Sequence, residues 1–490
     1  MLKSFHNFWR GFCYNFIMTR TLPLLFILLI GFTTFGIQGQ EIKLKKGIII
    51  DSLKVQDSIQ DSFALFLPQK FELKGKWPLL VIFDMDGRGK KEMAKFTQVA
   101  NQYNYILAAS NSVYDSLSLT ENMVRTKRLT DHLLKLLPIN KSQMYTIGIH
   151  DAGRFATLVP ILLKDMSGVI TINSAIANID PINEKNKFQF ISIIERTNFN
   201  YPMILKDEKV LNGLKFPNSI LLEESIENNF YKLLDQSISY LELLAMSKGI
   251  RSKDSALVAA FYKRDVRRIE NFIKEGEYLL ANRALKESID VFRNLKDTDS
   301  LKALKKNLNR RKEYRTLKRQ EEAALFKEAL LQEDFVLAME QDVFTYNYNN
   351  LGWWNYQMGQ LEKFAQSDNK FEKEIGQRLK GYVNELTEFH LGMVRIQEIV
   401  DEEALVFLFM LKTIIQPNKF DNYLKVASIA AKNEDFGTAL FYLEEALKNG
   451  FKSREELYSI PNTALLRITP EFNALIEKYF SEARYKIKDE

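Results

Sequence analysis

A tight turn at residues 148–153, with the sequence GIHDAG, constrains the fold of this chain more than any other segment. The apolar, strand-like segment Met144–Ile147 precedes the turn, and the helix-like segment Arg154–Leu163 follows it. A strand that passes into a helix through so few residues is typical of alternating α/β folds, in which the turn lies at the carboxyl end of a buried strand.

The side chains within this turn indicate which residue stands at its apex. A sharp strand-to-helix turn leaves room only for small residues two positions before and two positions after the apex. His150 has Gly148 and Ala152 at these positions, whereas Asp151 would have the bulky Ile149. The spacing therefore places His150 at the apex.

Short apolar segments and amphipathic helical segments alternate through the front half of the chain. A continuous apolar run such as Leu79–Phe83 is typical of a strand buried on both faces. The predicted strands are Ser62–Leu67, Leu79–Phe83, Tyr105–Ala109, Met144–Ile147, Gly168–Ile172, Phe188–Ile194 and Ser219–Leu222, and the predicted helices are Glu92–Tyr103, Val124–Leu137 and Arg154–Leu163. Such alternation with short links predicts a doubly wound parallel sheet.

The stretch from about Leu65 to Ala175 resembles the α/β-hydrolase superfamily, in the esterase branch of polyhydroxybutyrate depolymerase-like and feruloyl esterase-like proteins. The matching segments are WPLLVIFD (77–84), DGRG (86–89), YNYILAASN (103–111) and MYTIGIHDAGRFA (144–156). The resemblance implies a hydrolase fold with a nucleophilic serine at the apex, where this chain has His150.

The same resemblance implies that the other two members of the catalytic triad are also replaced. Asn198, in the segment TNFNY, stands where an aspartate is expected, and residues 223–229 (EESIENN) lack the expected final histidine. Loss of triad members typically costs on the order of 10⁴- to 10⁶-fold in rate, so an ordinary esterase is not expected. A backbone oxyanion hole from Met85 or Asp86 with Asp151 would not need these side chains.

Two interpretations of His150 follow. It could be a new catalytic group assisted by Asp151, Asp84 or Asp86, or it could cap a helix in a site that no longer reacts, which we favour. No metal or other cofactor is expected, because no ligand spacing accompanies His150.

The amino-terminal segment is typical of an export signal. Leu22–Phe35 is an apolar segment of 14 residues after the basic Arg20, shorter than the roughly 20 residues that a membrane anchor needs. We expect a signal peptide over residues 1–39, with Met18 as an alternative start. The only cysteine, Cys13, precedes the apolar segment. A lipid anchor on a cysteine directly after the apolar segment is therefore excluded.

Beyond about residue 245 the pattern is helical. Prolines are absent between Pro217 and Pro417, and apolar residues recur every three or four positions. Asp421–Gly450 has alanines at tetratricopeptide-like intervals, and Gly276–Leu295 is a poorer unit. We therefore predict an α/β-hydrolase-like domain over 40–245 and an all-α tetratricopeptide-like domain over 246–490.

Two features of the helical part are candidate interaction surfaces. Lys302–Arg319 holds nine basic residues, Arg310 and Arg311 among them, and one acid; a solvated helix is the simpler interpretation. The pair Trp353 and Trp354 could be an exposed anchor, but such pairs more often pack in a core. A net charge of +6 from 68 basic and 62 acidic residues does not favour nucleic acid.

The sequence leads to two functional hypotheses. The first is a non-catalytic scaffold or adaptor, exported to the periplasm or the outer membrane of a Gram-negative bacterium, with envelope proteins as partners and no membrane span after cleavage. The alternative is an esterase or carbohydrate-ester hydrolase that uses His150 and Asp151 in a non-standard way.

Overall fold

The computed structural model describes residues 45–56, 58–183, 185 and 187–484. The chain divides into two units, Met1–Lys45 and Lys46–Glu490, and every element named below belongs to the second. The expected export signal at 1–39, with Cys13 and Met18, lies outside the described residues. Within the described residues, no helix has the length and apolar content needed to cross a membrane.

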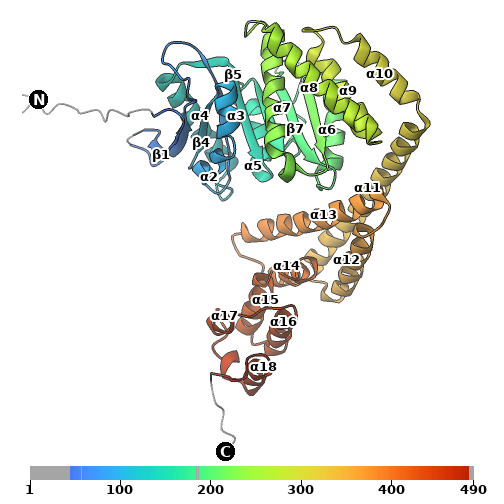
Figure 1. Ribbon diagram of the computed structural model, residues 1–490. Coiled ribbons are helices and arrows are strands. Elements are labelled where there is room, and N and C mark those ends of the chain that lie inside the picture. The colour runs from blue at the N-terminus through green and yellow to red at the C-terminus, as the bar shows by residue number, and fades with distance from the viewer. Residues whose placement is uncertain (1–44, 57, 184, 186, 485–490) are drawn as a thin grey trace, which may run out of the picture. The chain divides into compact units, whose positions relative to one another are not determined.

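The front half forms the predicted mixed α/β structure around a single sheet (Figure 1). Its strands are β1 (Ile49–Lys54), β2 (Ser62–Phe66), β3 (Trp77–Ile82), β4 (Ile106–Ser110), β5 (Ile139–Ile149), β6 (Gly168–Ile172), β7 (Gln189–Glu195) and β8 (Asn218–Glu223). The strand order is β1-β2-β4-β3-β5-β6-β7-β8. Strand β2 pairs antiparallel with both neighbours, whereas β3 to β8 are parallel. This arrangement is α/β-hydrolase-like, as predicted, but the prediction of a wholly parallel sheet was wrong, because β2 runs antiparallel to its neighbours, and β1 was not predicted.

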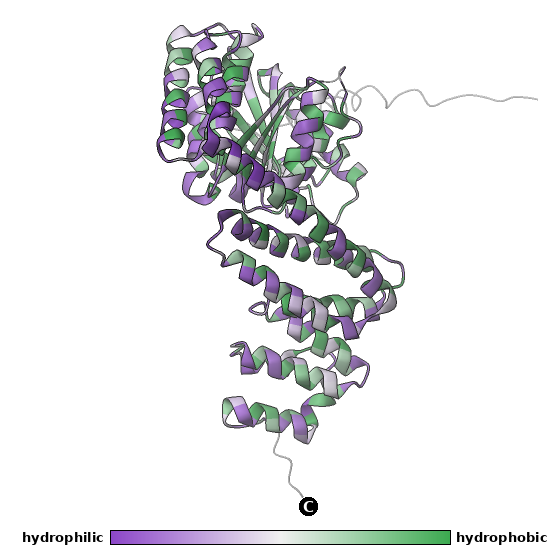
Figure 2. Cartoon of the chain, turned by 90° about the vertical axis from the view of Figure 1, so that its right-hand side faces the viewer, coloured by the Kyte–Doolittle hydropathy of each residue, from purple (hydrophilic) through white to green (hydrophobic). Residues whose placement is uncertain are grey.

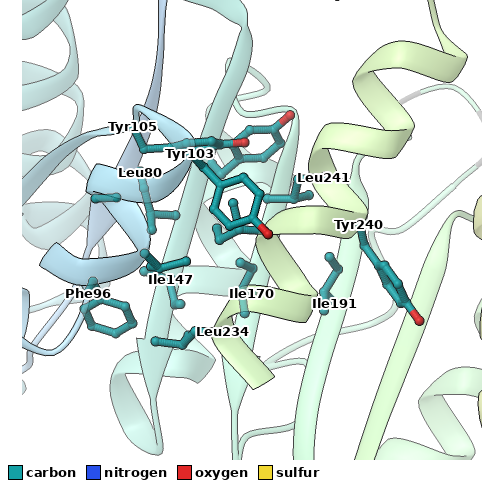
Figure 3. Close-up of a cluster of buried hydrophobic side chains, with 14 of the residues drawn as sticks. Leu80, Phe96, Tyr103, Tyr105, Ile147, Ile170, Ile191, Leu234, Tyr240 and Leu241 are labelled. Carbon is teal, nitrogen blue, oxygen red and sulfur yellow. The ribbon is translucent and has the colours of Figure 1, made fainter. Parts of the chain in front are cut away.

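The strands form this sheet because their apolar side chains are buried on both faces. Figure 2 shows hydrophobic residues along the strands and mixed colours along the helices. On one face, Leu80, Ile147 and Ile170 from neighbouring strands pack against side chains of the covering helices (Figure 3). These strand residues are completely buried, so the central strands lie in the core as the continuous apolar runs predicted.

Helices cover both faces of the sheet. They are α2 (Gly89–Ala94), α3 (Thr97–Tyr103), α4 (Leu119–Leu136), α5 (Asp151–Leu162), α6 (Tyr201–Gly213) and α7 (Ile226–Ser247). The helix predicted over Glu92–Tyr103 is divided into two at the buried Phe96. Helix α5 packs against β5 and β6, and an edge-to-face contact between Phe83 and Phe155, with ring centroids 4.9 Å apart, fixes its first turns.

The rest of the described chain is helical, as predicted. Its α-helices are α8 (Ser255–Lys274), α9 (Tyr278–Phe292), α10 (Asp299–Arg310), α11 (Lys312–Thr345), α12 (Leu351–Ala365), α13 (Lys370–Arg395), α14 (Glu402–Ile415), α15 (Asp421–Lys432), α16 (Phe436–Lys448), α17 (Arg454–Ser459) and α18 (Pro470–Phe480). Residues on α8 and α9, such as Phe261 and Phe292, share a hydrophobic cluster with the sheet. Side chains thus pack together across the predicted domain boundary at 245/246, and that boundary stays a prediction.

The segment Asp421–Gly450 forms a pair of packed helices, α15 and α16, joined by residues 433–435. Ala427, Ala439 and Leu443 are completely buried between them and their neighbours. Small side chains at these positions let the two helices approach closely. The tetratricopeptide-like character of this pair remains a proposal.

Candidate functional site

The turn between β5 and α5 has the backbone of a nucleophile elbow. His150 has φ 51° and ψ −122°, a conformation that side-chain-bearing residues rarely adopt. Its amide donates to the carbonyl of Ile172 at 2.9 Å, and its own carbonyl accepts from the amide of Gly153 at 2.9 Å. These bonds hold the apex above the carboxyl ends of β5 and β6.

Close backbone contacts explain the small residues around the apex. A Cβ atom on Gly148 would lie 2.2 Å from the carbonyl oxygen of Ala152, and one on Gly153 would lie 2.7 Å from the Cβ of Ser174. Neither space admits a side chain without a shift of the backbone. The geometry thus places His150 where the residue spacing placed it.

The side chain of His150 is exposed, and it has no hydrogen-bond or ion-pair partner among the described residues. Asp151, also exposed, follows it in the first turn of α5. The other two described histidines lie elsewhere. His132 packs edge-on against Phe63, and His390 lies on α13 beside Phe389. Burial lowers the pKa of both His132 and His390. Among the described residues, the elbow therefore has no imidazole base paired with a nucleophile.

The loop after β7 uses Asn198 for local structure. Its amide donates to the carbonyl of Glu195 at 3.1 Å, and its side-chain oxygen accepts from the amide of Asn200 at 2.9 Å. This is the turn-forming role that asparagine commonly has in loops. Asn198 supports the backbone and holds no imidazole.

Two glutamates at the strand ends were not predicted from the sequence as site residues. At the end of β7, the Glu195 carboxylate accepts from the amide of Ile226 at 2.6 Å and faces the Asn173 side-chain amide at 3.5 Å. Glu223 at the end of β8 is buried, and burial raises its pKa. Each directly follows an apolar strand, which is the signal that could have identified them.

The loop after β3, where the backbone oxyanion donors were expected, is held by its own charges. The Asp84 carboxylate accepts from the amide of Arg88 at 2.7 Å and from its guanidinium at 3.2 Å, and Arg88 also pairs with Asp86. The carbonyl of Met85 accepts from the amide of Asp115 at 2.9 Å. Met85 and Asp86 thus lie in an ordered loop at the same end of the sheet as the elbow.

Helix α13 contacts the loop after β7 through a buried ion-pair network. The Arg196 guanidinium donates to both carboxylate oxygens of Glu374 at 2.8 and 3.0 Å. Arg378 pairs with Glu328 of α11 at 2.7 Å and donates to the carbonyl of Arg196 at 2.6 Å. Arg196, Arg378 and Glu328 are 2%, 1% and 0% exposed. Burial lowers the pKa of Arg196, but Glu374 outweighs it, so the pKa is raised overall.

Further along α13, the helix reaches the neighbourhood of the elbow. A Cβ atom on Gly381 would contact the Phe199 ring at 3.4 Å. Burial raises the pKa of the Glu385 carboxyl, and the charge of Asp151 raises it further while Arg154 lowers it. Glu385 on α13 thus adds another carboxyl group near the elbow.

The candidate interaction residues differ in accessibility. Trp354 is completely buried and donates its indole N–H to Asp342 at 2.8 Å, while Trp353 is partly buried and packs edge-on against it at 4.9 Å. Arg310 and Arg311 are exposed at the junction of α10 and α11. No group of three or more metal-ligating side chains lies in the described part of the chain.

Comparison with known proteins gives partial likenesses in structure. No family model and no curated protein matches the chain. Among solved structures, a thermostable esterase is 14% identical, with a TM-score of 0.29, over 37% of this chain and 56% of its own length. The chain thus spans little more than half of that protein.

Two further solved esterases match over nearly their whole length. Est1E from Butyrivibrio proteoclasticus is 10% identical, with a TM-score of 0.31, over 39% of this chain and 98% of its own. A ferulic acid esterase is 12% identical, with a TM-score of 0.32, over 40% of this chain and 97% of its own. Likeness at this level carries no conclusion about activity. The mixed sheet and its elbow identify an α/β-hydrolase-like fold.

Proposed function

We propose that this chain is a non-catalytic α/β-hydrolase-like protein that acts as a scaffold or adaptor through its helical part. The observation that carries the proposal is that the loop after β7 packs against α11 and α13 through buried ion pairs. Arg196 in this loop is buried in ion pairs with Glu374 and Glu321. The loop that supplies the triad acid in the resembling family serves here as a packing surface.

The chemistry at the elbow supports the same proposal. A nucleophile needs an adjacent base to take its proton and a third group to orient that base. His150 has neither among the described residues, and Asn198 is bonded within its own loop. A backbone oxyanion hole alone stabilises an intermediate that this site has no means to form.

A cavity of about 460 Å³ in the helical part offers a surface for a partner. It lies where α14 meets the α15–α16 pair, and its lining includes Phe441, Glu403 and Asp435. Phe441 is 55% exposed, so its ring is accessible to a partner. An apolar floor beside two carboxylates suits a peptide with a basic residue next to a hydrophobic one. We propose that this partner is an envelope protein, which the chain meets after export.

The alternative, an esterase or carbohydrate-ester hydrolase using His150 and Asp151, is favoured by one observation. His150 is exposed and stands in a strained backbone conformation, and such residues cluster at functional sites.

An aryl-ester assay distinguishes the two functions. We expect no turnover above buffer from the full chain, and no change in His150→Ala or Asp151→Ala. Wild-type turnover that disappears in His150→Ala would establish the alternative and remove the adaptor proposal.

The adaptor role is tested separately, by crosslinking and co-purification from envelope extract. We expect a partner that is retained by the wild type and lost in Phe441→Glu. Met203→Glu on α6, whose parent side chain is 49% exposed, is the matched control and should retain it. A protein that is always recovered alone and monomeric contradicts the adaptor role, and recovery with the cytoplasmic fraction contradicts the expected export.

A further inference from the structure

Two adjoining cavities lie at the amino ends of the strands, opposite the elbow. Their volumes are about 560 and 320 Å³, and they share Gln189, Leu244 and Lys248 in their linings. Gln189 and Asn218, the first residues of β7 and β8, lie in the larger cavity. We call the two cavities together the amino-end groove.

Five lysines from five different segments line this groove. They are Lys141, Lys164, Lys187, Lys215 and Lys248, and all five are exposed. None forms an ion pair within residues 45–56, 58–183, 185 and 187–484; the ammonium of Lys187 donates only to the carbonyl of Lys215, at 3.0 Å.

The carboxylates in the lining do not balance these charges. Asp165 pairs with Lys127 at 3.2 Å, and Asp290 pairs with Arg293 at 2.5 Å. Like charges gathered around one concave surface repel one another and raise the local concentration of anions. The charge of the lining therefore favours a ligand with several negative charges.

The neutral part of the lining indicates what else the ligand carries. Asn212, Asn218, Asn294, Ser219 and Ser247 supply amides and hydroxyls. The side-chain oxygens of Gln189 and Asn218 are buried acceptors without a hydrogen-bond donor among the described residues. An unsatisfied buried acceptor is costly, and a ligand hydroxyl reached by a small side-chain movement would satisfy it.

Aromatic stacking is not offered by this surface. Phe216 and Tyr145, the aromatic residues in the lining, are 2% and 4% exposed. Proteins that bind single-stranded nucleic acid usually present exposed aromatic rings to the bases. The combination of unpaired lysines, amides and hydroxyls suits an anionic carbohydrate better.

We propose that the amino-end groove binds an acidic oligosaccharide, with the lysines holding its carboxylates and the amides and hydroxyls holding its hydroxyl groups. This site is separate from the elbow and from the cavity near Phe441, so it stands or falls independently of the adaptor role.

Calorimetric titration of the full chain with three probes tests the proposal. Tetragalacturonate carries both charges and hydroxyls, maltotetraose only hydroxyls, and tripolyphosphate only charges. We expect tetragalacturonate to bind at least about tenfold more tightly than either of the others. Equal binding of maltotetraose would overturn the role of charge, and equal or tighter binding of tripolyphosphate would overturn the role of hydroxyls.

Charge reversals locate the site. The variant K164E/K187E/K248E should weaken tetragalacturonate binding at least about tenfold. The matched control K363E/K419E/K452E reverses three exposed lysines of the helical part and should bind like the wild type. Equal loss in both variants would show general charge attraction and overturn the site.

A neutral substitution tests the hydroxyl contacts without altering charge. Gln189→Leu keeps a similar volume and removes the unsatisfied acceptor, and we expect about a threefold loss of affinity with an unchanged circular dichroism spectrum. Unchanged affinity in a folded variant would contradict the proposed contact.

Discussion

The elbow and the loop after β7 lie at the same end of the sheet, yet different interactions hold them in place. At the elbow, close contacts of Gly148 and Gly153 with the backbone and with Ser174 fix the turn, while the His150 side chain has no partner among the described residues. In the loop after β7, the Arg196 side chain forms buried ion pairs, and the side-chain oxygen of Asn198 accepts a hydrogen bond. Close packing around the turn thus fixes the elbow, whereas the loop after β7 is a packing surface for the helical part.

The largest effect is expected from breaking the buried network. Arg378→Ala leaves the Glu328 carboxylate, which is 0% exposed, without its bidentate partner. Removing one member of a buried ion pair typically costs about 3–5 kcal/mol, so we expect an unfolding free energy lower by about 4 kcal/mol. Chemical denaturation followed by tryptophan fluorescence measures it.

An exposed ion pair is the control for this variant. Lys302 and Asp299 on α10 pair at 2.9 Å, with side chains 57% and 79% exposed. Exposed pairs contribute little, so Lys302→Ala should leave the denaturation midpoint almost unchanged. Equal effects of the two substitutions would mean that the loop after β7 is not held by its buried charges.

A smaller loss is expected from adding one methyl group at the elbow. Gly148→Ala places a Cβ atom 2.2 Å from a backbone oxygen that cannot move independently. Overpacking of this kind costs about 3 kcal/mol, which thermal denaturation would show as a lower midpoint.

Gly359→Ala on α12 is the matched control, because nothing lies within 4 Å of its added Cβ. It should stabilise the helix by about 1 kcal/mol. If Gly148→Ala is tolerated as well as Gly359→Ala, the elbow is not a fixed feature of this fold.

We expect the stability of the protein to depend on pH through one buried carboxyl group, Asp207. Asp207 on α6 is buried and accepts from the amide of Ile176 at 3.1 Å. Burial raises its pKa from 3.8 to about 6, against the opposing effects of this hydrogen bond and Arg154. The folded protein therefore holds a proton that the unfolded chain releases, and stability falls as the pH rises from about 4 to about 6.

The expected loss over this range is about 2 kcal/mol, and it levels off above the folded-state pKa. The difference in unfolding free energy between wild type and Asp207→Asn, measured across this range, isolates the contribution of this one group. Parallel stability curves for the two proteins would show that Asp207 titrates as it does in the unfolded chain.

The sheet and the elbow could be predicted from sequence because their signals are local. The apolar run Leu79–Phe83 and the small residues around His150 depend only on neighbours along the chain, and the structure has both where they were expected. Strand β1 was missed because its sequence, IIDSLK, mixes apolar and polar residues and its burial is partial. An edge strand of this kind lacks a clear pattern.

The buried network could not be predicted because its partners are far apart in sequence. Arg196 and Glu374 are separated by 178 residues, and nothing near either position indicates the other. Glu328 and Arg378 both lie within charged helical segments that resemble solvated faces. Which charges become buried is decided by the packing of α11 and α13 on the loop after β7, and local sequence patterns carry no information about that packing.

The smallest effect is expected from releasing the strain at the apex. A residue with a side chain at φ 51° and ψ −122° costs about 1–3 kcal/mol, and glycine adopts this conformation freely but loses some entropy on folding. His150→Gly should therefore stabilise the protein by about 1 kcal/mol, whereas His150→Ala keeps the Cβ and should not. If both variants are equally stable, the backbone is not strained at the apex. If only glycine stabilises and the aryl-ester assay stays at background for every variant, the strain follows from the turn that the sheet requires and supports no reaction.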